Sequence, residues 1–138
     1  MRIHVLLLLI LSSCAVEPTT VSKTFELRQL QTAQLTAEKA KDLGIIVELR
    51  SSKPDDIHKQ LRIECPSSID DSIFELADLA IYAGQEVITN FTLDARVAGD
   101  GKILMHRNLN TNIVTDVSIT LFYGNSVSYE LPLSLNAL

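Results

Sequence analysis

Few side chains in this sequence are of the types that bind metals or act as nucleophiles. The 138 residues include two cysteines, Cys14 and Cys65, and three histidines, of which His58 and His106 lie well inside the chain. A zinc site needs several such ligands at close and regular spacing, whereas these residues stand on separate segments. We therefore expect no metal ion and no dissociable cofactor.

Two pairs of carboxylates, Asp55-Asp56 and Asp70-Asp71, are the remaining candidates for chemistry. A calcium loop places carboxylates at alternating positions and closes with a glutamate, which neither pair does, so both pairs are interpreted as solvated turns. The sequence also has no recognisable nucleophile turn and no glycine-rich phosphate loop. This pattern favours a binding module over an enzyme.

Cys14 is distinguished by the segment that precedes it. Arg2 gives a basic start, residues 5–11 form an unbroken apolar run, and the run ends in Leu11-Ser12-Ser13-Cys14. A basic start, an apolar run of about 7–15 residues and small residues at its end are typical of a secretory signal, whereas a membrane span needs about 20 apolar residues. The sequence therefore predicts export.

The last four of these residues resemble the lipobox of bacterial lipoproteins. The resemblance implies that Leu11, Ser12 and Ser13 are recognised by the signal peptidase, and that Cys14 receives diacylglycerol and becomes the new N-terminus. The alternative is an ordinary signal peptide with a chance cysteine. In enterobacterial lipoproteins an aspartate directly after the lipidated cysteine favours the inner membrane. This sequence has Ala15, so the resemblance implies a lipid-anchored protein on the periplasmic face of the outer membrane.

This segment also predicts how the chain is divided. Residues 1–13 form the lipoprotein signal peptide, residues 14–23 the lipidated N-terminus and an extended tether, and residues 24–138 one folded domain. The formal net charge of −5 becomes −6 once Arg2 is removed. Such an acidic balance argues against nucleic acid and against adhesion to anionic lipid by charge, so attachment is expected through the covalent lipid. With Cys14 lipidated, Cys65 has no disulfide partner and is interpreted as buried on a strand face.

The domain is predicted to be all-β. Short alternations of apolar and polar residues recur between turns, and about seven to eight such strands in one small domain indicate a β-sandwich of mostly antiparallel strands. Phe91, Leu93, Ala95 and Val97 are expected to face the core, and Asp100-Gly101 to form a hairpin turn. The expected strands are residues 24–28, 45–50, 60–65, 91–97, 102–105, 113–115, 117–123 and 127–131, with a polar loop at 108–112.

Two stretches allow two interpretations each. Residues 36–43 fit either a short helical turn ended by Gly44 or a loop. In residues 72–82 a capping box from Ser72 to Glu75 and the glycine at position 84 favour a helix. The alternation of Phe74 and Leu76 favours a strand, and the family resemblance described below favours a strand followed by a loop.

The register of the last hairpin can be derived by counting. A two-residue loop would pair Leu121 with Ser128 and set apolar against polar residues along the ribbon. A three-residue loop over residues 124–126 instead pairs Tyr123 with Val127, and the apolar faces of both strands then coincide. Since a slip of one residue turns every side chain to the opposite face, we predict the three-residue loop.

A longer pattern begins at Phe91. Phe91-Thr92-Leu93-Asp94-Ala95-Arg96-Val97 is followed by Gly101-Lys102-Ile103-Leu104-Met105 and then by Asn112-Ile113-Val114-Thr115. This order is similar to one in small β-sandwich lipoproteins, namely the YbaY-like envelope lipoproteins and the YscW-like pilotins of type III secretion. Residues 45–50 resemble the second strand of that family, and residues 60–66 and 74–76 fall where its next two strands are expected. The likeness covers most of residues 24–123, but residues 77–84 lack the proline-containing segment of the family.

The pilotin branch implies an outer-membrane lipoprotein that binds a segment of a secretin subunit and promotes the localisation and oligomerisation of the secretin. The implied partners are therefore the outer membrane, through the lipid on Cys14, and a secretin. The alternative is a general YbaY-like envelope lipoprotein with a structural or stress-related role and no dedicated secretin partner. Phe122 and Tyr123, expected as exposed aromatics near the last hairpin, are the candidate partner-binding residues.

Overall fold

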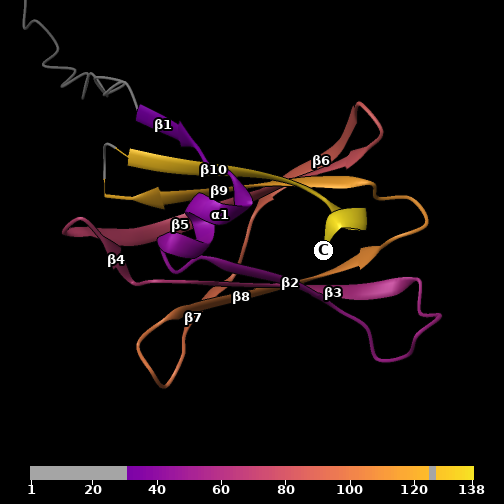
Figure 1. The fold of residues 1–138 in the computed structure, drawn as a ribbon, viewed down its shortest axis with the longest axis horizontal. Coiled ribbons are helices and arrows are strands. Elements are labelled where there is room, and N and C mark those ends of the chain that lie inside the picture. Colours follow the sequence, from indigo (N-terminus) through magenta and orange to yellow (C-terminus); the bar gives the residue numbers. More distant parts are fainter. Residues whose placement is uncertain (1–30, 125–126) are drawn as a thin grey trace, which may run out of the picture.

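The structure, a computed structural model, describes residues 31–124 and 127–138. These residues form two β-sheets packed face to face, together with one short helix and a C-terminal 3-10 turn (Figure 1). The prediction of an all-β sandwich is thus confirmed. The expected signal peptide, the tether and the expected strand at residues 24–28 lie outside the described residues.

Short elements follow one another closely along the chain. Within the described ranges they are β1 (Gln31–Gln34), α1 (Ala37–Asp42), β2 (Ile46–Arg50), β3 (His58–Cys65), β4 (Ser68–Ile69), β5 (Ser72–Ala83), β6 (Glu86–Thr92), β7 (Ala95–Val97), β8 (Ile103–Asn110), β9 (Asp116–Tyr123), β10 (Val127–Ser134) and η1 (Leu135–Ala137). The strands outnumber the seven or eight predicted. The short strands β1 and β4, and most of β6, were not among those expected.

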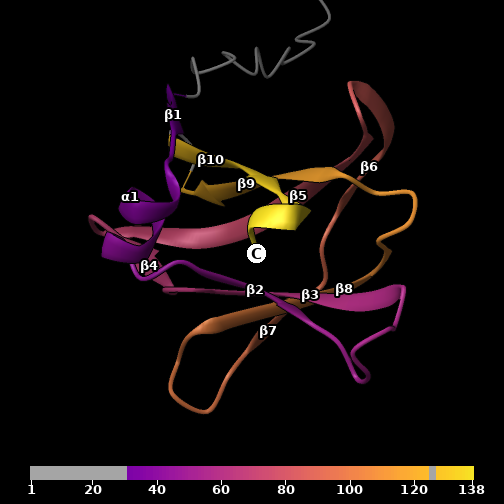
Figure 2. The ribbon, with the colours of Figure 1, turned by 45° about the vertical axis from the view of Figure 1, so that its right-hand side comes forward.

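The two sheets differ in size and in strand order. The six-stranded sheet has the order β1-β10-β9-β5-β4, with β6 also paired to β5, and the four-stranded sheet has the order β2-β3-β8-β7. Among the described strands the pairing is antiparallel except between β1 and β10, which run parallel. Figure 2 shows the two layers, with α1 at one side of the gap between them.

The core lies between the sheets and follows the predicted alternation. On β9 the residues at odd positions, from Val117 to Tyr123, are buried, and Leu61, Ile63 and Cys65 of β3 are buried in the facing sheet. Alternate side chains of a strand point to opposite faces, so one face of each strand supplies the core. The predicted burial of Cys65 is confirmed.

The single strand predicted over residues 91–97 is wrong. Residues up to Thr92 belong to β6 in the six-stranded sheet, whereas Ala95–Val97 form β7 in the other sheet. Leu93 is buried at this crossing, where its backbone N–H donates a 2.8 Å hydrogen bond to the carbonyl oxygen of Ala77. Val97 is 74% exposed and not in the core, because β7 is the outermost strand of its sheet. Regular alternation did not reveal that the chain changes sheets.

The ambiguous stretch that begins at Ser72 is a strand as far as Ala83. β5 runs without a loop from Ser72 to Ala83, with a bulge between Phe74 and Leu76, and Ala77, Leu79 and Ile81 are buried at a spacing of two. It pairs with β9 on one side and with β6 on the other. The apolar face of this central strand therefore outweighs the local capping signals, so the helical interpretation is wrong.

The region after β8 also differs from prediction. β8 continues to Asn110, across residues expected to form a polar loop, because β3 pairs with it along its whole length. The strand expected at residues 113–115 is a turn in which the backbone N–H groups of Ile113 and Val114 both donate to the carbonyl oxygen of Asn110. The final hairpin is as predicted: Tyr123 pairs with Val127, Leu121 with Tyr129, and Ile119 with Leu131.

Candidate functional site

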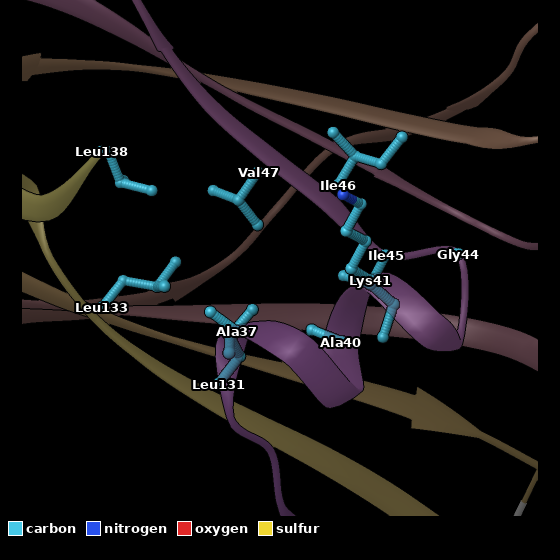
Figure 3. A pocket seen from close by; sticks show the side chains of 10 residues that line it. All are labelled: Ala37, Ala40, Lys41, Gly44, Ile45, Ile46, Val47, Leu131, Leu133 and Leu138. Carbon is cyan, nitrogen blue, oxygen red and sulfur yellow. The ribbon is translucent and has the colours of Figure 1, made fainter.

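An apolar groove lies between the facing edges of the two sheets, beside α1 (Figure 3). Its volume is about 480 Å³. One wall is formed by Ile45, Ile46 and Val47 at β2, and the other by Leu131 and Leu133 of β10 together with Leu138. Ala37, Ala40 and Lys41 of α1 and Gly44 close one end. We call this set of residues the apolar groove.

The groove exists because the edge of the six-stranded sheet is only partly covered. β1 pairs with β10 over Val127–Glu130 and then turns away at Leu35, so that Leu131–Ser134 have no neighbouring strand on that side among the described residues. In the other sheet β2 is the edge strand. Two incompletely covered sheet edges therefore face each other across the groove.

α1 covers one end of this opening as a result of local sequence signals. The hydroxyl of Thr36 accepts a hydrogen bond of 3.3 Å from the backbone N–H of Lys39 and caps the helix. Ala40 is buried, and its carbonyl oxygen accepts a 2.8 Å hydrogen bond from the N–H of Ile45. Gly44 leaves the helix with a φ of +78°, a conformation that favours glycine. The helical alternative for residues 36–43 is therefore confirmed.

Lys41 is the charged residue of the groove. Its side chain extends from α1 toward the wall that carries Ile46 (Figure 3). The described residues supply no ion pair to it. An amine on an otherwise apolar rim is suited to an acidic group of a bound molecule.

Arg62 and Lys102, two cations on the outer face of the four-stranded sheet, are by contrast paired within the domain. Arg62 contacts Glu64 at 3.3 Å and Lys102 contacts the same carboxylate at 2.7 Å. Hydrogen bonding to Glu64 raises the pKa of Lys102, although this lysine is exposed to solvent. These pairs neutralise part of the charge on this face.

Tyr123, one of the two residues predicted to bind a partner, is not exposed. It is fully buried, since it belongs to the inward face of β9, and its ring packs edge-to-face on Phe74 and Tyr129 at centroid distances of 5.7 and 5.8 Å. Phe122 points to the opposite face of the same sheet, opposite Leu76 of β5, and is partly exposed. Neither aromatic residue lines the apolar groove.

The remaining sequence-predicted residues are not brought together. Cys14 and Leu11-Ser12-Ser13 lie outside the described residues. His58 pairs with Asn110 and His106 with Arg62, at different points along the four-stranded sheet. Asp70 and Asp71 form the turn between β4 and β5, both with positive φ. Over residues 31–124 and 127–138 no cluster of three His, Cys, Asp or Glu side chains could hold a metal ion.

Sequence reasoning missed the groove residues because they come from two segments far apart in the sequence, residues 37–47 and residues 131–138. One available signal was Pro132, which is strongly disfavoured in a central strand and indicates an edge. Another was Lys41, which follows Ala37 and Ala40 at helical spacing on the face that packs against the sandwich.

None of the helices in the described part of the chain has the length and apolar character required to cross a membrane. No protein-family model, curated protein or solved structure matches this chain. The description that the fold supports is an all-β sandwich with an apolar groove between β2 and β10.

Proposed function

We propose that this protein is an outer-membrane lipoprotein that acts as a pilotin, the assembly chaperone of a type III secretion secretin. In this role it binds a segment of the secretin subunit, carries the subunit to the outer membrane and promotes oligomerisation of the ring. The folded domain is a binding module rather than an enzyme. The observation that carries the proposal is the apolar groove.

The apolar groove leaves apolar side chains open to solvent along its rim. Ile46 is 42% exposed and Leu138 is 44% exposed, and both lie on its rim. Burial of apolar surface contributes about 25 cal/mol per Å², so an apolar peptide segment gains free energy by covering these side chains. Because this contribution is apolar, binding should survive moderate salt.

Delivery depends on a second, separable part of the chain. Cys14 supplies the only thiol at the lipobox-like segment, and the acidic domain provides no electrostatic substitute for an acyl anchor. The groove and the lipid then have different tasks: the groove holds the client and the lipid determines where the client is taken. A protein that lacks the lipid should bind the secretin and leave it away from the outer membrane.

Fractionation of secretin multimers in three strains tests this proposal. The strains are the wild type, a deletion of the gene, and Cys14→Ser, with palmitate incorporation measured to verify the loss of lipid. We expect outer-membrane multimers in the wild type alone, and a secretin complex with the protein in the periplasm of the Cys14→Ser strain. Equal multimers in all three strains would refute the pilotin role and leave the YbaY-like alternative. Unchanged palmitate labelling in Cys14→Ser would refute the lipoprotein assignment itself.

A further inference from the structure

The backbone of β2 has hydrogen-bonding groups directed into the apolar groove. Along a strand the N–H and C=O groups of successive residues point alternately to the two sides. The N–H of Ala98 donates to the carbonyl oxygen of Lys102 at 2.7 Å, and the N–H of Thr111 donates to that of Ile57 at 2.8 Å. The first bond shows that the N–H and C=O groups of the even-numbered residues of β8 point to β7. The second bond agrees with this, because it shows that those of the odd-numbered residues point to β3.

The direction of the backbone N–H and C=O groups in β3 and β2 follows from the same alternation. The even residues of β3 face β2, where Glu64 pairs with Ile46 and Arg62 pairs with Glu48. Val47 and Leu49 therefore direct both their N–H and C=O groups away from the sheet. Val47 lines the apolar groove, and both side chains pack against the core from the inward face. An edge of this kind can accept another strand.

The edge of β10, on the other side of the apolar groove, cannot accept a strand in the same way. The carbonyl oxygen of Glu130 in β10 accepts a 2.8 Å hydrogen bond from the N–H of Leu35, so this residue faces the open side. Two residues further on, Pro132 faces the same side and has no N–H to donate. Of the two edges that border the groove, β10 is closed by a proline and β2 is open.

The apolar groove between β2 and β10 has a volume of about 480 Å³. α1 lies at one end of it and Leu138 at the other (Figure 3). A strand added about 4.8 Å from β2 would occupy the apolar groove, and its alternate side chains would be directed at Leu131 and Leu133. One acidic residue near its α1 end would meet Lys41.

We propose that β2 binds an extended segment of a partner protein as an additional strand of the four-stranded sheet. The segment alternates apolar and polar residues and carries a carboxylate that pairs with Lys41. The identity of the partner as a secretin rests on the proposed function, whereas the mode of binding rests on the edges described above.

A proline substitution provides the test. Val47→Pro removes an N–H that faces the opening and leaves the pairing of β2 with β3 in place. Val97→Pro is the matched control, because Val97 also lies on an edge strand. The backbone N–H and C=O groups of its neighbour Arg96 point to β8, so those of Val97 point away from the sheet. Two probes are used with the full-length protein in detergent. One is a set of overlapping peptides of about ten residues that cover the secretin of the same organism, and the other is a synthetic peptide of alternating Val and Thr with one Glu.

We expect Val47→Pro to weaken peptide binding by about tenfold or more, as expected for lost backbone hydrogen bonds, and Val97→Pro to leave it unchanged. We expect Lys41→Gln to weaken binding of the Glu-containing peptide but not of its Gln counterpart. Amide hydrogen exchange of the unmodified protein gives a readout that does not depend on the folding of any variant: bound peptide should slow exchange at Val47 and Leu49.

The outcomes separate the two proposals. Binding of the synthetic peptide with slowed exchange at Val47 and Leu49, but no binding of secretin peptides, would support strand addition and count against the pilotin role. Secretin binding without protection of these amides would overturn strand addition and leave the pilotin role intact. If neither probe binds, strand addition is refuted. A dimer in sedimentation that Val47→Pro dissolves would make a second copy the occupant and would also overturn the proposal.

Discussion

The phenolic hydroxyl of Tyr123 donates a 2.8 Å hydrogen bond to the backbone carbonyl oxygen of Pro66. Tyr123 ends β9 in the six-stranded sheet, and Pro66 directly follows β3 in the four-stranded sheet. The bond therefore joins the two layers of the sandwich across the core. It also explains why a polar atom is tolerated at one of the most deeply buried positions of the domain.

Tyr123→Phe should lower the free energy of unfolding by about 1–2 kcal/mol, because the carbonyl oxygen of Pro66 loses its buried donor while the ring packing is retained. Urea denaturation monitored by circular dichroism measures the change. Tyr82→Phe is the control, since no hydrogen bond of the Tyr82 hydroxyl to a described residue is present. Equal effects of the two substitutions would show that the bond to Pro66 contributes nothing specific.

The same hydroxyl predicts a loss of stability in alkali. Burial, followed by the hydrogen bond with Cys65, raises the pKa of Tyr123 in the folded protein, whereas an unfolded tyrosine titrates near pH 10. The unfolded chain therefore loses this proton first, and above about pH 10 the free energy of unfolding should fall by up to about 1.4 kcal/mol per pH unit. This contribution is fully present below pH 10.

Denaturation of the wild type and of Tyr123→Phe between pH 8 and about pH 11 isolates this contribution, because Tyr129 and Cys65, whose pKa values are also raised by burial, remain in both proteins. The two stabilities should converge as the pH rises. Parallel profiles would mean that the pKa of Tyr123 does not differ between the folded and unfolded states.

The sequence was informative wherever one face of a strand is buried. The register of the β9–β10 hairpin followed from apolar pairing alone, because a slip would have moved Leu121 and Ile119 to the wrong face. The same reasoning failed at Leu93, since alternation continues through the point where the chain changes sheets. The local alternation of apolar and polar residues indicates which face of a strand is buried, but it does not indicate which of the two sheets the strand belongs to.

The groove could not be predicted in the same way. It depends on how far β1 covers β10, and on α1 lying against a sheet edge from another part of the chain. For β5 the local signals at Ser72 and Glu75 favoured a helix and the alternation of Phe74 and Leu76 favoured a strand. The pairing with β9 and β6 decides between them. Properties that arise from contacts between distant segments are weakly encoded in any short stretch.

Gly44 should be required for the placement of α1 beside the groove. Its φ of +78° lies in the left-handed region, where a Cβ costs about 1–2 kcal/mol. Gly44→Ala should therefore lower the free energy of unfolding by about that amount. Gly99→Ala is the control, because Gly99 does not have a positive φ and a Cβ there would meet no atom within 4 Å. Thermal unfolding of both variants decides the matter, and equal melting temperatures would contradict the conformational argument.

The last prediction concerns the two thiols. Cys65 is fully buried, and burial raises its pKa above the ordinary value, so little thiolate is available to a reagent at neutral pH. We expect the folded protein to react slowly with a disulfide reagent such as Ellman's reagent and the urea-unfolded protein to react at once. A single added surface cysteine, Ser51→Cys in the exposed turn before β3, serves as the fast-reacting control.

The number of thiols that react after unfolding also reports on Cys14. If the thiol of Cys14 is held in a thioether to diacylglycerol, the unfolded protein from the envelope should expose one reactive thiol per chain, that of Cys65. The same protein with Cys65→Ala should then expose none, and a form produced without its signal segment, with Cys14 unmodified, should expose two. Two reactive thiols in the envelope protein would contradict lipidation, and fast labelling of the folded protein would contradict the burial of Cys65.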